Sequence, residues 1–369
     1  MIMTFSTRLL HSTMALAMLA SAVPAQAGAM EDLVAAAQKE GELTVIALPR
    51  DWCGYGKVID GFKAKYNLKV NELNPDAGSA DELEAIRANK DNKGPQAPDV
   101  IDVGLAFGPQ AQKEGLLQPY KVMTWDEIPA DVKDADGHWY ADYYGVMAFG
   151  VNKDIVKTTP ADWADLLKPD YANSVALTGD PRASNQAILA IMSAGMSRGA
   201  QPGTESGEKG LELMAELNKA GNFVPVTGKS GTIAQGQTPI VVAWDYNLLA
   251  WRDSLKGNPP MDVVIPASSS LAGVYVQAIS AFAPHPNAAR LWMEYIYSDE
   301  GQLAWLEGYC HPARFNAMSA AGKISPELLA KLPPAEGYAK AVFPTVAQQE
   351  ANKAAVTGGW DKVVGANVQ

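Results

Sequence analysis

The stretch Thr178–Asn185 combines a turn with two charged side chains that could hold a small solute. It reads Thr-Gly-Asp-Pro-Arg-Ala-Ser-Asn and lies between the apolar run Ser174–Leu177 and a segment whose apolar residues have helical spacing. Pro181 suits the first turn of a helix and Asp180 stands where an N-cap would, so the free backbone N–H groups of that turn would face an anion. Arg182 could grip a carboxylate with two parallel hydrogen bonds, while Asp180 could accept a hydrogen bond from an amine. The pattern predicts a site for a small zwitterion.

A second interpretation of this stretch is purely structural. Asp180 could be only a cap, and Arg182 could be only a surface or ion-pair residue. The rest of the chain has to decide between the two interpretations.

The first 27 residues have the pattern of a secretory signal peptide. Arg8 precedes the apolar run Met14–Val23, and Ala25–Ala27 is a small-x-small cleavage site. The apolar run has about ten residues, whereas a membrane-spanning helix needs roughly twenty. No cysteine lies near the expected cut after Ala27, which argues against a lipid anchor. We therefore expect a soluble exported protein, with the periplasm as the favoured destination.

Charge and length limit the possible functions. The chain has 369 residues and a formal net charge of −11, and removal of residues 1–27 with Arg8 would make it −12. An acidic chain does not suit nucleic acid or anionic membranes, which need a basic surface. The remaining 342 residues are enough for two lobes with separate cores.

The two cysteines are Cys53 and Cys310. In an oxidising compartment a pair this sparse is expected to form one disulfide. The alternative is a pair of buried free thiols.

Strand and helix patterns alternate along most of the chain, which predicts an α/β fold with parallel sheets. The expected strands are Leu43–Leu48, Leu68–Leu73, Pro98–Val103, Gly145–Asn152, Pro239–Trp244, Met261–Pro266 and Gly273–Ile279. The expected helices are Met30–Glu40, Val58–Tyr66, Ser79–Asn89, Asn185–Met196, Leu211–Ala220, Ala288–Tyr297 and Gly301–Leu306, with a Gly-rich exposed linker at Arg198–Gly210. Ligands of such sheets bind at the carboxyl ends of strands, here Arg50–Tyr55 and Gly104–Phe107.

Several motifs, in their order and spacing, resemble the extracellular solute-binding proteins of ABC importers, in particular the spermidine/putrescine-binding (family 1) branch. They are Lys113–Leu117, Gly150–Asn152, Trp163-Ala-Asp-Leu-x-Lys168-Pro-x-Tyr171, Trp244, Asp262-Val-Val-x-Pro266 and Gly308-Tyr-x-x-Pro312. The resemblance covers nearly the whole chain after the signal peptide, and the Trp163–Tyr171 motif is its most specific part.

The resemblance implies a two-lobed periplasmic-binding-protein fold of type II. Each lobe would be a mainly parallel sheet flanked by helices, with the ligand cleft between the lobes. We expect lobe 1 to comprise residues 28–146 and 276–320, and lobe 2 to comprise residues 147–275 and 321–369. The implied partners are a small-molecule solute and a cognate ABC permease in the inner membrane. We expect a monomer that needs no cofactor.

The family's site residues can be carried over one by one. Its acidic position in the second-lobe turn falls on Asp180, its cleft aromatic on Trp244, and a Trp-x-Asp pair on Tyr275-x-Gln277. Polyamine binders have a second acid where this chain has Ala183, and Gln277 replaces the later Asp. A dication without these counter-charges would cost several kcal/mol to bury, so the pattern disfavours a polyamine.

We therefore predict a ligand with one acid group and one amine, such as the ω-amino acid 4-aminobutyrate. Arg182 and the helix start at Ser184 would hold the acid group. Asp245 or Asp180, with aromatic rings, would hold the ammonium by ion pairing and cation–π contact. The complete set of expected ligand-binding residues is Trp52, Tyr144, Asp180, Arg182, Ser184, Trp244, Asp245, Tyr275 and Gln277.

Three alternatives remain open: a polyamine binder for import, a solute-sensing receptor partner, and a ferric-ion binder. Ferric binders of this kind use a tyrosine pair, but Tyr143 and Tyr144 are adjacent, and neighbours on a strand point to opposite faces. His138, His285 and His311 have no metal-ligand spacing. The chain lacks a Gly-x-Ser-x-Gly elbow, and Gly228–Gly231 is only part of a phosphate loop. We expect no enzyme activity.

Overall fold

The structure is a computed structural model that describes residues 22–330, 332 and 340–369. Most of the expected signal peptide, residues 1–21, lies outside the described residues. The first helix begins at Ala22, before the expected cleavage point after Ala27. Within the described part of the chain, no helix is both long and apolar enough to cross a membrane.

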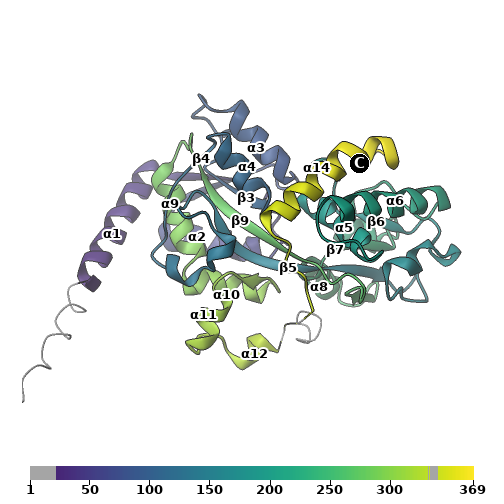
Figure 1. Cartoon of the computed structure of the whole chain (residues 1–369). Coiled ribbons are helices and arrows are strands. Elements are labelled where there is room, and N and C mark those ends of the chain that lie inside the picture. Colours follow the sequence, from purple (N-terminus) through teal and green to yellow (C-terminus); the bar gives the residue numbers. More distant parts are fainter. Residues whose placement is uncertain (1–21, 331, 333–339) are drawn as a thin grey trace, which may run out of the picture.

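Helices lie on the outside of the sheets (Figure 1). Their bounds are α1 Ala22–Glu40, α2 Tyr55–Tyr66, α3 Ser79–Ala88, α4 Phe107–Lys113, α5 Asn185–Met196, α6 Thr204–Ala220, α7 Ser230–Ala234, α8 Asp245–Leu255, α9 Pro286–Ile296, α10 Asp299–Glu307, α11 Phe315–Ala320, α12 Pro326–Leu329 and α14 Val346–Val363. The strands are β1 Glu42–Ile46, β2 Lys69–Leu73, β3 Val100–Gly104, β4 Leu117–Gln118, β5 Tyr140–Asn152, β6 Val175–Leu177, β7 Ile240–Trp244, β8 Met261–Val264, β9 Ala272–Ser280 and β10 His311–Pro312.

The strands form two sheets. β1 and β2 make a parallel pair, and the larger sheet has the order β3-β9-β5-β7-β6, with β4 on β9 and with β8 and β10 on β5. The α/β class is confirmed. Most strand pairs are antiparallel rather than parallel, because β9 runs antiparallel to β3, β4 and β5, and β5 runs antiparallel to β7, β8 and β10. Among the strands of the described residues, β6 and β7 add a second parallel pair.

Strand β5 extends across the molecule between two groups of helices (Figure 1). Residues Tyr140–Val146 pair with β9, whereas Met147–Asn152 pair with β7 and β8. The change of partners occurs at the position where we expect the chain to pass from lobe 1 to lobe 2. The division into lobes at these residues remains a prediction.

The helices α5, α6 and α14 pack against one another beside β6 and β7. α5 is apolar around its whole circumference and is buried nearly throughout, so it lies between the sheet and the outer helices. α6 begins at Thr204, so the second half of the expected Gly-rich linker is helical. A Cβ atom at Gly210 would lie 2.0 Å from the carbonyl oxygen of Ile191 in α5, and glycine is therefore what permits this close contact between helices.

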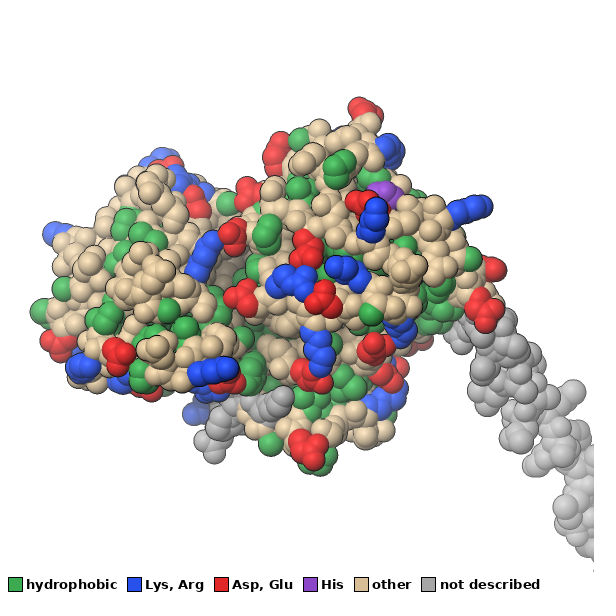
Figure 2. All heavy atoms as spheres, turned by 180° about the vertical axis from the view of Figure 1, so that it is seen from behind, with side chains coloured by type: hydrophobic (Ala, Val, Ile, Leu, Met, Phe, Trp, Pro, Cys, Tyr) green, Lys and Arg blue, Asp and Glu red, His purple; other side chains and the backbone are tan. Residues whose placement is uncertain are grey.

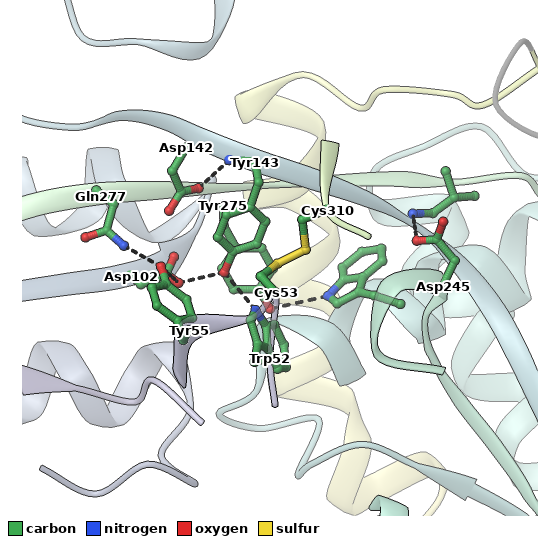
Figure 3. Close-up of a disulfide and its surroundings, with 12 residues drawn as sticks. Trp52, Cys53, Tyr55, Asp102, Asp142, Tyr143, Asp245, Tyr275, Gln277 and Cys310 are labelled. Carbon is green, nitrogen blue, oxygen red and sulfur yellow. Dashed lines mark hydrogen bonds between the residues drawn. A yellow bond between two sulfur atoms is a disulfide. The ribbon is translucent and has the colours of Figure 1, made fainter. Parts of the chain in front are cut away.

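Cys53 and Cys310 form the expected disulfide, with their Cα atoms 5.4 Å apart (Figure 3). It joins the turn after β1 to the segment just before β10. Both side chains are fully buried.

Candidate functional site

A cavity of about 360 Å³ lies where the loops at the ends of several strands meet the first turns of helices. Its lining comes from the turn after β1, the start of α3, β3, the turn before α5, the segment before α7, α8 and β9. The lining residues used below are Asp51, Trp52, Asp76, Gly78, Asp81, Glu82, Asp102, Asp180, Ser184, Gln186, Lys229, Asn247, Trp251 and Tyr275. Figure 2 shows a hollow between two halves of the molecule with acidic and basic side chains beside it.

The turn before α5 is built differently from the sequence prediction. Ser184, not Asp180, is the N-cap of α5, and its Oγ accepts a hydrogen bond from the backbone N–H of Ala187. The Asp180 carboxylate instead accepts a hydrogen bond from the backbone N–H of Arg182 at 2.9 Å. Gly179 has a φ of 121°, a conformation that favours glycine, and it lets the chain turn sharply after β6.

Arg182 is turned away from the cavity. Its guanidinium donates to the Asp180 carboxylate at 2.6 Å and also to Asp361 and Asn367 in the C-terminal segment. Burial raises the pKa of Asp180, but hydrogen bonds from Arg182 lower it by more, so the pKa lies below its usual value. The structure therefore does not support the predicted contact between Arg182 and a ligand, because its planar group is already committed to protein oxygens.

Of the nine residues predicted to contact the ligand, four line the cavity and five do not. Those that line it are Trp52, Asp180, Ser184 and Tyr275, and those that do not are Tyr144, Arg182, Trp244, Asp245 and Gln277. α8 begins at Asp245, directly after the last residue of β7, so no loop presents these residues to solvent. The later α8 residues Asn247 and Trp251 reach the cavity instead.

The displaced residues have structural contacts of their own. Trp244 is fully buried and donates weakly to the Tyr275 hydroxyl at 3.5 Å. The Asp245 carboxylate accepts a hydrogen bond from the backbone N–H of Val146 in β5. Tyr144 stacks on His311, with ring centroids 4.7 Å apart. Each of these residues thus has a contact within the protein, and its predicted contact with a ligand stays a prediction.

The cavity lining is strongly acidic. It includes Asp51, Asp76, Asp81, Glu82, Asp102 and Asp180. Lys229 is the one basic residue among the described residues of the lining. Lys229 pairs with Asp76 at 2.8 Å, and Asp81 accepts a hydrogen bond from the backbone of Gly78. The Asp51 carboxylate accepts a long hydrogen bond from the Trp251 indole. Such a lining attracts a cation.

A buried polar cluster lies beneath the aromatic wall of the cavity (Figure 3). Asp102 Oδ2 accepts hydrogen bonds from the hydroxyl groups of Tyr55 at 2.8 Å and Tyr143 at 2.6 Å. The Trp52 indole donates to the Tyr143 hydroxyl at 2.7 Å, and Gln277 donates to the Tyr55 hydroxyl at 2.8 Å. The cluster thus links the cavity wall at Trp52 to the carboxylate of Asp102.

Burial dominates the acidity of this cluster. It raises the pKa of Asp102 to about 6, against the opposing effect of hydrogen bonds from Tyr143 and Tyr55. It also raises the pKa of Glu82 well above its usual range, with the charge of Asp102 as the next cause. Glu82 accepts a hydrogen bond from the backbone N–H of Asp102 at 2.9 Å.

Two buried amide side chains, Gln186 and Asn247, also belong to the cavity lining. Gln186, in the first turn of α5, is 1% exposed, and neither its Nε2 nor its Oε1 has a hydrogen-bond partner. The Oδ1 atom of Asn247 is likewise buried without a partner. Because burial of an unpaired amide is costly, these atoms are suited to hydrogen bonds with a polar solute.

A small group of possible metal ligands lies outside the cavity lining. Asp134, Asp136 and His138 come close together in the loop before β5, and His138 Nδ1 lies 2.8 Å from Asp134 Oδ2. The sequence analysis weighed Tyr143 only as a ligand of ferric ion. In the structure it belongs to the cluster around Asp102.

Sequence reasoning missed most of the acidic lining. Asp102 falls inside an expected strand, where alternation alone does not show which side chains reach a ligand. The sequence analysis noted Lys229 only as one residue of an incomplete phosphate-loop motif. Gln186 and Asn247 carry no motif that distinguishes them from other helix residues.

Comparison with known proteins identifies the relatives of this chain. A family model for bacterial extracellular solute-binding proteins matches residues 96–334. The iron uptake protein A2 of Synechocystis sp. is 24% identical over 72% of this chain and 80% of that protein. The spermidine/putrescine-binding periplasmic protein of Escherichia coli is 24% identical over 63% of this chain and 67% of that protein.

A solved structure has the same fold. The periplasmic binding protein AfuA from Actinobacillus pleuropneumoniae, with fructose-6-phosphate bound, superposes with a TM-score of 0.67 at 22% identity. The superposition covers 88% of this chain and 99% of AfuA. The type II periplasmic-binding-protein fold is thereby confirmed.

Proposed function

Because the chain belongs to the family of bacterial extracellular solute-binding proteins, we propose that the solute it captures is a small molecule carrying a protonated amine. It is the periplasmic solute-binding component of an ABC importer, and it works with a membrane permease. Its relatives bind solutes and are not enzymes. The chemical class of the solute is inferred from the residues that line the cavity.

The observation that carries the proposal is the set of acidic and aromatic residues in the cavity lining. Asp51 and Asp102 lie in the lining together with the rings of Trp52 and Tyr275. Carboxylates and aromatic faces in a partly desolvated site stabilise an ammonium group by ion pairing and cation–π contact. The spermidine/putrescine-binding relative is named for ligands of this class.

Other residues of the cavity lining favour a second, acidic group on the same solute. Lys229 lines the cavity and supplies a positive charge, which it shares with Asp76, Gln186 supplies an unpaired amide, and Ser184 caps the N-terminus of α5. These groups take the part that the sequence assigned to Arg182. An ω-amino acid such as 4-aminobutyrate has an ammonium for one end and a carboxylate for the other.

A polyamine is the second candidate, and the acidic excess of the lining favours it. Of the six acidic lining residues, Asp76 and Asp180 are already paired with Lys229 and Arg182, and burial raises the pKa of Glu82 well above its usual range, which leaves Asp51, Asp81 and Asp102. A dication such as putrescine would use this charge for both of its ammonium groups, whereas a zwitterion would use it for one.

A ligand screen tests the amine proposal. We would follow thermal unfolding of the exported protein with 4-aminobutyrate, putrescine, spermidine, fructose 6-phosphate and ferric ion. A ligand at 100 times its dissociation constant should add about 2.7 kcal/mol to the free energy of unfolding. We expect stabilisation by an amine. Stabilisation by the sugar phosphate or by iron, with no response to any amine, would overturn the proposal.

Lys229→Ala separates the two candidates. If the solute is a zwitterion, loss of the cation facing its acid group should weaken binding about tenfold or more. If the solute is a polyamine, removal of a like charge should leave binding level or improve it. Lys209→Ala is the matched control, because Lys209 is an exposed lysine of α6 that pairs with Glu205 and does not line the cavity. Isothermal titration with 4-aminobutyrate and putrescine measures both variants.

The remaining assignments complete the proposal. Lobe 1 (28–146 and 276–320) and lobe 2 (147–275 and 321–369) would close over the solute in a monomeric protein cleaved after Ala27. A contact between Ala80 N–H in α3 and the Ala183 carbonyl, at 3.3 Å, joins the two sides of the cavity and supports this closure. A role in sensing rather than import would be favoured if deletion of the gene abolished a response to the amine but left its uptake intact.

A further inference from the structure

Asp142 is a buried carboxyl group that the proposed function does not use. It lies in β5, is fully buried, and does not belong to the cavity lining. Its Oδ1 accepts a hydrogen bond from the backbone N–H of Tyr143 at 2.7 Å, and its side chain also bonds with Gln277. Figure 3 shows its carboxyl group pointing toward Asp102, which does line the cavity.

The carboxyl group of Asp142 points toward that of Asp102 (Figure 3), and each group affects the pKa of the other. Asp102 Oδ1 and Asp142 Oδ2 are both buried, and each lacks a protein donor. Two ionised carboxylates cannot hydrogen-bond to each other, because each can only accept. One proton placed between these two oxygens would satisfy both atoms at once and remove the repulsion between them.

The surroundings contain acids and phenols. The titratable groups that face the pair are Tyr55 from α2, Glu82 from α3, Tyr143 from β5, Tyr246 from α8, Tyr275 from β9 and Tyr297 after α9. In the described part of the chain, neither Asp102 nor Asp142 has a lysine, arginine or histidine partner. A second full negative charge would therefore be uncompensated.

The two acids differ in what stabilises their charged forms. Tyr55 and Tyr143 both donate to Asp102, whereas Asp142 has neither of these hydroxyl donors. Burial, followed by the negative charge of Asp102, raises the pKa of Asp142 well above its usual range. Burial raises the pKa of Asp102 to only about 6. As the pH falls, Asp142 therefore binds a proton first, and Asp102 binds one at lower pH.

We propose that Asp142 stays protonated at neutral pH and donates its proton to Asp102 Oδ1, which leaves Asp102 as a single negative charge facing the cavity that mild acidification neutralises. Asp142 is then a positioning residue, and Asp102 is the group that meets the ammonium. The consequence for binding rests on the amine ligand proposed above, whereas the protonation of Asp142 does not depend on any ligand.

The charge of Asp102 makes amine binding sensitive to pH. A carboxylate that must be ionised in order to bind loses affinity about tenfold for each pH unit below its pKa. Between pH 7 and pH 5 the dissociation constant for the amine should therefore rise about tenfold. No such change is expected from the exposed carboxylates, because the pKa values of ordinary Asp and Glu side chains lie below this range.

Asp142→Asn and Asp102→Asn distinguish this arrangement from two ordinary buried acids. Because Asn supplies an N–H donor where the neutral acid supplied O–H, Asp142→Asn should bind putrescine or 4-aminobutyrate at pH 7 within about threefold of the wild type. Asp102→Asn should lose about 30-fold or more, because the ammonium then lacks its partner. Glu294→Gln is the control, since it alters another buried acid, which is bonded to Tyr120 and does not line the cavity.

Infrared difference spectroscopy tests the protonation without a ligand. At pH 7 the carbonyl band of one protonated carboxylic acid should disappear in Asp142→Asn and remain in Asp102→Asn. An unchanged band in Asp142→Asn would show that Asp142 is ionised and would overturn the inference. So would amine binding that is insensitive to pH between 7 and 5, or that is lost in Asp142→Asn while the fold is kept. If neither amine binds, the proposed function fails, and the infrared result alone decides the state of Asp142.

Discussion

Replacement of both Cys53 and Cys310 by serine should lower the stability of the protein by a calculable amount. The disulfide closes a loop with a sequence separation of 257 residues. The loop-entropy relation then gives about 5.5 kcal/mol of stabilisation, through restriction of the unfolded chain. Dividing by an unfolding entropy of roughly 2.1 cal/mol/K per residue for the exported chain gives a fall in Tm of about 8 °C.

Calorimetry and urea unfolding of the double variant measure this loss. Wild-type protein treated with reductant in its unfolded state and then refolded should show the same Tm as the double variant. Amine affinity should change less than about threefold, because Trp52 and Tyr55 on either side of Cys53 are held by their own hydrogen bonds. A loss below about 1 kcal/mol, or two thiols that can be alkylated in the native protein, would refute the reasoning.

Two further predictions concern packing and pH. Gly210→Ala should destabilise the protein by about 1–3 kcal/mol in urea unfolding, because its Cβ would lie 2.0 Å from the Ile191 carbonyl oxygen. Gly358→Ala in α14 meets no atom within 4 Å and should instead stabilise by about 0.5–1 kcal/mol, and equal effects of the two substitutions would contradict this account of helix packing. Burial lowers the pKa of Lys353 to about 8, where its Nζ lies over the Phe107 ring and donates to Gln110. The native state therefore releases this proton at lower pH than the unfolded state, so stability should rise between about pH 8 and the ordinary lysine pKa of about 10.4, and Lys353→Met should abolish that rise.

The fold was largely accessible from the sequence, because it depends on periodic patterns. The alternation of apolar strands and amphipathic helices predicted most elements within a few residues, including α5 at its observed bounds of Asn185–Met196. The linker expected before Leu211 was wrong in its second half, because the glycines that suggested flexibility there serve a close contact between helices. The mixed sheet could not be foreseen, since strand direction in β5 and β9 depends on pairings between distant residues.

The site was accessible only in part. The turn at Asp180 and the aromatic residues Trp52 and Tyr275 lie at the cavity as the pattern suggested. Arg182 lies outside the cavity lining and pairs with Asp180. Residue type shows that a guanidinium can bind a carboxylate, but it does not show which carboxylate. The role of Asp102 depends on hydroxyl groups from α2 and β5, which no local motif reveals.

The pairing of β9 also sets the order in which the polypeptide can complete its structure during biosynthesis. β9 lies between β3 and β5, and its residue Ile279 pairs with Val100. A nascent chain that ends before Ala272 would expose β3 and the first half of β5 as unpaired edges, which are prone to aggregation. Formation of the sheet must therefore wait until nearly three quarters of the polypeptide is available, and until then such a chain depends on chaperones or on a delay in folding.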